Sequence, residues 1–181
     1  MTISSETPID DSRDQVLWQP HAAVDGHYAD WLLRRGLLTP DLQASLGEAV
    51  AIDVLSEGYR SAPSWTADLV PSEPALGWCR EITMSFGGRV YVHAECYAPA
   101  ATIRAHRWLE SLGAKPLGGA LAELPDTRRT SMAFSNDAQA GNTRVESSAW
   151  ARRSVFEVQG HPLFLIEYLS PALAGISREA G

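Results

Sequence analysis

The sequence from residue 78 to residue 97 reads WCREITMSFGGRVYVHAECY. Apolar and polar residues alternate on both sides of Gly87-Gly88, and this is the period of a β-strand, whose successive side chains point to opposite faces. Two adjacent glycines can both adopt the positive φ that a tight two-residue turn requires. The stretch therefore predicts a β-hairpin with strands at 78–86 and 89–97.

A turn at Gly87-Gly88 predicts the register of this hairpin, since residues whose numbers add to 175 then face each other. In that register Arg80 lies on an apolar face of the sheet, opposite Glu95. An unpaired buried charge costs several kcal/mol, so such a position needs a partner or a use. Two interpretations of Arg80 stay open: an internal ion pair with Glu95, or a guanidinium that clamps a substrate carboxylate.

A second pair of strands is predicted at 151–158 and 162–169, around Gly160. Glu167 lies in the later strand, which is apolar on both faces. It either pairs with Arg152 or Arg153, or acts as a desolvated carboxylic acid on a hydroxyl or ether oxygen of a substrate.

The remaining patterns are shorter. Strands with helices inserted between them, without strict alternation, favour the α+β class: a single antiparallel sheet with helices packed on it. The expected elements are a helix at 28–36, a helix starting near 39–41 with Thr39 as N-cap, a strand at 50–55 with a turn at 57–59, a loop at 61–74, a helix after Pro99 that stops at Gly113, a helix at 118–124 and a loop at 135–148.

The chain length of 181 residues fits one domain of ordinary size. We expect a flexible N-terminal tail at 1–24, the domain at 25–175 and a C-terminal tail at 176–181. The apolar runs are too short to span a bilayer, and the N-terminus lacks a basic start, so we expect an unprocessed cytoplasmic protein without membrane insertion. The net charge of -7 argues against a nucleic-acid partner.

The metal-binding residue types are scattered along the chain. Cys79 and Cys96 lack clustered zinc spacing, and the five histidines form no helical pair with ligand spacing, so we expect no metal. The predicted register places the two cysteines opposite each other, where we expect packed thiols.

Several strings of the sequence occur in an order that resembles a known family, the bacterial chorismate–pyruvate lyases of ubiquinone biosynthesis. The resemblance runs from about Trp31 to Ala172. Its longest string, LGAKPLG at 112–118, both begins and ends with Leu-Gly. The strings are WLL (31–33), LT (38–39), SEGY (56–59), WCREI (78–82), LGAKPLG (112–118), WARRS (150–154) and LFLIE (163–167), followed by PA (171–172).

This resemblance implies a monomer with an enclosed site under helical flaps, no metal or organic cofactor, and cleavage of chorismate into 4-hydroxybenzoate and pyruvate. It implies ligand contacts from Arg80 and Glu167. Our hypothesis is that Arg80 holds the ring carboxylate and that Glu167 hydrogen-bonds or protonates the departing ether oxygen. The resemblance further implies a backbone contact from Leu117 and an apolar flap contact from Leu38. The small-molecule partners are then chorismate and 4-hydroxybenzoate.

One departure from the family pattern is Glu95, which stands where relatives carry a basic residue, so that in the predicted register an acid would compete for Arg80. Two alternative functions stay open. The chain could be an aromatic-acid sensor, because ligand-binding domains of some transcription factors resemble this fold. Alternatively, Glu95 could mark an inactive homologue that only binds 4-hydroxybenzoate. The short polar region before Trp31 does not fit a DNA-reading helix-turn-helix, which argues against a transcription factor.

Overall fold

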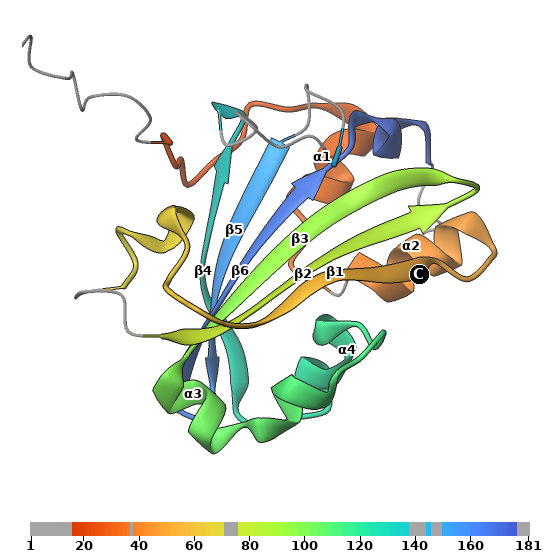
Figure 1. The fold of residues 1–181 in the computed structure, drawn as a ribbon. Coiled ribbons are helices and arrows are strands. Elements are labelled where there is room, and N and C mark those ends of the chain that lie inside the picture. The colour runs from red at the N-terminus through yellow and green to blue at the C-terminus, as the bar shows by residue number, and fades with distance from the viewer. Residues whose placement is uncertain (1–15, 37, 71–75, 138–143, 146–149, 177–181) are drawn as a thin grey trace, which may run out of the picture.

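The computed structural model describes residues 16–36, 38–70, 76–137, 144–145 and 150–176. The described strands form one antiparallel sheet of six strands in the order β1-β2-β3-β6-β5-β4, with short helices beside it (Figure 1). The predicted α+β class is confirmed. The elements are α1 Gly26–Leu32, α2 Leu38–Leu46, β1 Ala51–Arg60, β2 Gly77–Phe86, β3 Arg89–Pro99, α3 Ala100–Ala105, α4 Leu117–Ala122, β4 Thr127–Ser135, β5 Trp150–Val158, β6 His161–Leu169, and short 3-10 helices at Ser64–Thr66, Arg107–Ser111 and Pro171–Gly175.

The predicted hairpin is confirmed as β2 and β3, but its register was predicted wrongly. Phe86 pairs with Arg89 as expected, and a bulge at Tyr91 then shifts every later pair by one residue. Arg80 therefore faces Cys96, and Glu95 lies on the other face of the sheet. The predicted Arg80–Glu95 pair does not form, and Cys79 and Cys96 point to opposite faces because their paired partners are Tyr97 and Arg80.

Three further local predictions were wrong. β1 continues through the expected turn at 57–59, because an edge strand tolerates Gly58 at φ 148°. The helix expected up to Gly113 is broken at His106, whose φ of -128° and ψ of 59° are not helical. Thr39 lies inside α2, which already begins at Leu38.

Strand β4 was not predicted. The loop expected at 135–148 falls mostly on residues outside the described part of the chain, and Ser135 itself ends β4. None of the described helices is long and apolar enough to cross a membrane.

The segment before α1 crosses the β4 edge of the sheet. Gln19 forms an isolated antiparallel bridge with Phe134, and Trp18 packs with Ala151 and Tyr168 on the face of the sheet opposite the four α-helices. The domain boundary near residue 24 stays a prediction, because residues 1–15 and 177–181 are outside the described part.

Two apolar clusters lie on the helix-covered face of the sheet. One is centred on α1 and α2 and the other on α3 and α4, and α2 and α4 also contact each other. Between the clusters the sheet carries small side chains at Ala94 and Cys96. Because close-packed interiors leave few voids, small residues below two short helices are where a cavity can open.

Candidate active site

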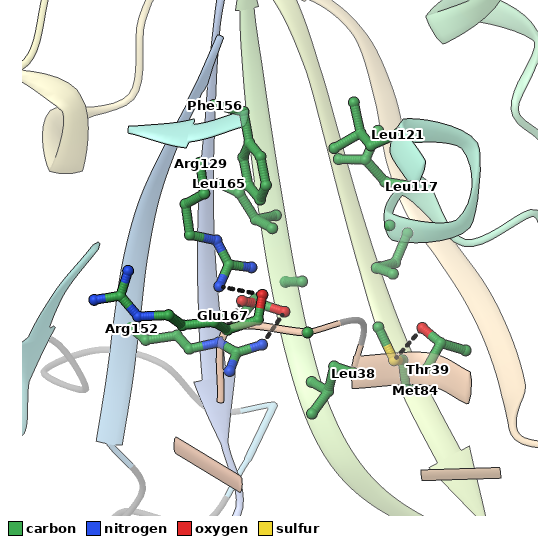
Figure 2. Close-up of a pocket in the computed structure, with 15 residues that line it drawn as sticks. Leu38, Thr39, Met84, Leu117, Leu121, Arg129, Arg152, Phe156, Leu165 and Glu167 are labelled. Carbon is green, nitrogen blue, oxygen red and sulfur yellow. Dashed lines mark hydrogen bonds and ion pairs between the residues drawn. The ribbon is translucent and has the colours of Figure 1, made fainter. Parts of the chain in front are cut away.

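A mainly apolar cavity lies between the sheet and the helices, where the two apolar clusters meet. It measures about 700 Å³ when its opening to solvent is included. Figure 2 shows Glu167 and Arg129 at one end of this space and Leu117 and Leu121 at the other. A concave, mainly apolar site with a few polar groups in its wall is the usual form of a small-molecule site.

Glu167 forms a buried bidentate ion pair with Arg152 on the neighbouring strand. Arg152 Nε donates to Oε2 at 2.6 Å, and Nη2 donates to Oε1 at 3.0 Å. Glu167 on β6 and Arg152 on β5 are directly opposite in the register. This confirms the ion-pair interpretation of Glu167, with Arg152 as the partner. Glu167 still lines the cavity, so the pair and a ligand contact are compatible.

The other guanidinium nitrogen of Arg152 holds the end of α1. Nη1 donates to the carbonyl of Trp31 at 3.1 Å, of Leu32 at 3.4 Å and of Arg34 at 3.1 Å. The last carbonyls of a helix have no partner within it, and a buried cation satisfies them. Arg152 therefore connects two parts of the site: the Glu167 carboxylate and the segment between α1 and α2, where α2 is one of the helices that cover the cavity.

A second arginine, Arg129, reaches the cavity from β4. Its Nη1 donates to the carbonyl of Arg35 at 3.2 Å, with longer contacts to Arg34 O at 3.4 Å and Met132 Sδ at 3.5 Å. Its guanidinium carbon lies 4.9 Å from the centroid of the Phe156 ring. Burial lowers the pKa of Arg129, and the Glu167 charge opposes this effect.

Arg80 lies on the same face of the sheet but is not among the residues that line the cavity. Its Nη2 donates to the carbonyls of Gly113 and, at 3.2 Å, of Lys115. Nε is buried without a hydrogen-bond partner and lies 3.8 Å from Oε2 of Glu57. Burial lowers the pKa of Arg80, and the Glu57 carboxylate counters this. Nε thus makes no hydrogen bond among the described residues, and Glu57 is the nearby opposite charge.

The structure brings three of the four expected site residues to the cavity wall: Leu38 from α2, Leu117 from α4 and Glu167 from β6. Arg80 is not in the wall and lies two residues along β2 from the lining residue Ile82. Sequence reasoning missed Arg35 and Arg129, which also line the cavity. The string TRR at 127–129 contains two adjacent arginines. Because the strand β4 was not predicted, the sequence did not indicate which of them lies on the face of the sheet that carries the cavity.

The lining residues carry a positive balance. Arg35, Arg129 and Arg152 stand against Glu167 as the single carboxylate among the described lining residues. In a protein with a net charge of -7 this is a local reversal of sign, and it favours an anionic ligand.

The antiparallel sheet, the apolar cavity under short helices and the arginines in its wall together define a binding domain for small, partly apolar organic anions. A sequence model of the chorismate lyase family matches residues 12–175, and the chain belongs to that family. The probable chorismate pyruvate-lyase of Thiobacillus denitrificans is 31% identical over 171 residues, covering 88% of this chain and 91% of that protein. The chorismate pyruvate-lyase of Salmonella schwarzengrund is 29% identical over 153 residues, covering 83% and 86%.

Solved structures with the same fold are more distant. The C-terminal domain of PhnF aligns with a TM-score of 0.54 and 15% identity over 75% of this chain and 88% of that one. The possible transcriptional regulator YydK of Bacillus subtilis aligns with a TM-score of 0.53 and 14% identity, over 82% and 69%. At such identities the likeness shows the fold alone.

Proposed function

We propose that this protein is a chorismate lyase, a carbon–oxygen lyase that converts chorismate into 4-hydroxybenzoate and pyruvate. The observation that carries the proposal is Glu167: the single carboxylate among the described cavity-lining residues stands beside arginines in a chain of the chorismate lyase family. The non-catalytic sensor is not favoured, since the curated relatives with matching lengths are named as lyases.

The reaction breaks the bond between the ring and the ether oxygen of the substrate. A hydrogen leaves the neighbouring ring carbon, which bears the hydroxyl, and the ring becomes aromatic. The ether oxygen departs with the three-carbon side chain as enolpyruvate, which takes up a proton at its methylene carbon and becomes pyruvate. Because aromatisation supplies the driving force, the protein has mainly to orient the substrate, exclude water and handle protons.

Glu167 is the group that handles protons in this proposal. Its oxygens accept hydrogen bonds from Arg152, and a carboxylate held in this way is suited to accept further hydrogen bonds. In this proposal Glu167 accepts a hydrogen bond from the ring hydroxyl and takes the hydrogen that leaves the same ring carbon as a proton. Sequence alone had suggested that Glu167 donates to the ether oxygen, and the ion pair with Arg152 supports an acceptor.

Arg80 holds the ring carboxylate in this proposal. Two observations support this: Arg80 lies two residues along β2 from the cavity-lining Ile82, and its buried Nε has no hydrogen-bond partner among the described residues. The Leu117 backbone and the Leu38 side chain close the site from the two flaps, α4 and α2. No organic or metal cofactor takes part.

The proposed setting is a cytoplasmic monomer at the first committed step toward ubiquinone. A mainly apolar cavity under two flaps further predicts slow release of an aromatic product, which progress curves with added 4-hydroxybenzoate would reveal.

The test is to mix the purified protein with chorismate, without added metal or cofactor, and to measure both products. 4-Hydroxybenzoate is followed by its absorbance and pyruvate by a coupled dehydrogenase. Equal appearance of both products establishes the lyase. Tight binding of 4-hydroxybenzoate without pyruvate release from chorismate would overturn it in favour of a binding module.

A further inference from the structure

We propose that Arg129 binds the carboxylate of the enolpyruvyl side chain of chorismate and thereby distinguishes the substrate from the product. The inference rests on the proposed function and deepens it. Chorismate carries two carboxylates, one on the ring and one on the side chain, and Arg80 accounts for the first only. The second needs its own cation in a site that excludes water, because an unpaired buried charge is costly.

A β-bulge brings Arg129 to the cavity. Arg129 pairs with Phe156 and Ser131 pairs with Val155, so Thr130 is an extra residue in β4. The extra residue reverses the alternation of the strand, and Arg129 comes to lie on the face of Phe156 and the cavity. Its neighbour Arg128 points away and pairs with Glu157 in solvent. Bulges that re-aim a side chain are frequent next to active sites.

The donors of Arg129 are only partly used. Among the described residues its hydrogen bonds all come from Nη1, and Nε is buried without a partner. Arg152, by contrast, uses Nε and Nη2 on Glu167 and Nη1 on the α1 carbonyls. The edge of a guanidinium that includes Nε is one that binds a carboxylate in bidentate fashion. Arg129 has this edge to offer, and Arg152 does not.

The chemistry of the substrate fits this placement. The side-chain carboxylate is attached to the carbon that carries the ether oxygen, and the ether lies next to the ring hydroxyl that Glu167 accepts from. The anion must therefore lie within a few ångströms of Glu167, on the side where the cavity wall offers a cation. Arg129 and Glu167 line the same end of the cavity (Figure 2). Arg35 also lines the cavity, but it is exposed and its charge is therefore better screened by water.

This assignment predicts an asymmetry between the two ligands. Chorismate has the side-chain carboxylate and 4-hydroxybenzoate lacks it, so loss of the Arg129 guanidinium must weaken the first and spare the second. A merely structural role of Arg129, as a brace for the Arg34 and Arg35 carbonyls, would weaken both ligands alike.

The experiment compares Arg129→Gln and Arg129→Lys with the wild-type protein, and uses Arg128→Gln as the matched control. The KM for chorismate and the inhibition constant of 4-hydroxybenzoate are measured for each. Loss of a charge-assisted bidentate contact should raise the KM of Arg129→Gln by about tenfold or more, with the inhibition constant within about threefold of wild type. Arg129→Lys keeps the charge, so its KM should lie between those of wild type and Arg129→Gln. Equal rises in both constants, or no rise in either, would overturn the inference.

A binding measurement makes the test independent of turnover. The probes are 3-(carboxymethoxy)-4-hydroxybenzoate, which carries a second carboxylate, and the neutral-chain analogue 3-ethoxy-4-hydroxybenzoate. Wild type should bind the dicarboxylate more tightly, and Arg129→Gln should lose that preference. A wild-type protein without the preference refutes the role of Arg129. Failure of the proposed function would show separately, as binding of both probes by a protein that releases no pyruvate from chorismate.

Discussion

Arg152 and Glu167 join the segment before α2 to the sheet at the cavity, since Arg152 binds both Glu167 oxygens at 2.6 and 3.0 Å and also three carbonyls in and just after the last turn of α1. Both side chains are almost fully buried, with exposed fractions of 1% and 6%. A movement of the segment after α1 therefore acts on the carboxylate proposed to handle protons. Arg152 is a positioning residue in this arrangement.

Replacing Arg152 by Met should lower the free energy of unfolding by about 3–5 kcal/mol, because Glu167 is then left buried and unpaired. The measurement is urea unfolding followed by tryptophan fluorescence. The double variant Arg152→Met, Glu167→Gln is the control, since it removes the orphaned charge and should recover part of the loss. Equal stabilities of the single and double variants would contradict the prediction.

Replacing Glu167 by Gln should reduce kcat for chorismate by roughly 10²–10⁴-fold, the usual contribution of a positioned acid or base. The amide keeps the volume of the side chain and one acceptor for Arg152. Binding of 4-hydroxybenzoate, measured by calorimetry, should change far less than kcat. A near-normal rate would remove Glu167 from the proposed mechanism.

Replacing Arg80 by Lys should weaken 4-hydroxybenzoate binding by about tenfold or more, since a lysine cannot offer a bidentate edge to a carboxylate. The matched control is Glu57→Gln, which removes the nearby carboxylate at 3.8 Å and leaves the guanidinium in place. The control should bind the product at least as well as wild type. If Arg80→Lys binds normally, the ring carboxylate lies elsewhere.

One interpretation of the sequence paired Glu167 with an arginine, but it did not decide between Arg152 and Arg153. A carboxylate in a strand that is apolar on both faces demands a cation, and Arg152 and Arg153 were both available. The register decides between them, because adjacent residues of a strand point to opposite faces. Arg153 thus turns away to Asp68 and the Trp65 carbonyl.

The hairpin register shows a limit of local patterns. Alternation and the glycine turn predicted both strands correctly, but not the bulge at Tyr91. The carbonyl of Tyr91 accepts a hydrogen bond from Ser170 N at 2.8 Å, so the bulged residue is bonded to a residue far along the chain that a local pattern does not include. Arg129 was missed for a similar reason. The bulge at Thr130 decides that Arg129, and not Arg128, lies on the face of the sheet that carries the cavity.

Stability at acidic pH should depend on Asp68, which binds Arg153 at 2.6 and 2.7 Å. The hydrogen bonds to Arg153 hold the pKa of Asp68 below its ordinary value of 3.8. A carboxyl whose pKa is lower in the folded state stabilises that state at any pH above the pKa of the unfolded chain. This contribution is lost as the pH falls through the pKa of the folded state. The effect stays below about 1 kcal/mol, because the Asp68 side chain is 60% exposed.

Urea midpoints of wild type and Asp68→Asn test this at several pH values. The two proteins should differ at pH values above the ordinary pKa of 3.8 and converge at more acidic pH. A difference that persists unchanged in acid would mean that the amide alters packing and not charge.

Glu95 provides a test of the corrected register. It was expected to compete with the substrate for Arg80, but it lies on the other face of the sheet, where it accepts a hydrogen bond from Trp65 Nε1 at 3.1 Å. Glu95→Gln should therefore leave the KM for chorismate and kcat within about twofold of wild type, since a side chain across the sheet makes no contact with the ligand. Steady-state kinetics at equal protein concentration check this. A marked gain in activity would instead show that the carboxylate does oppose substrate binding, and would restore the reading of Glu95 as the mark of a weakened enzyme.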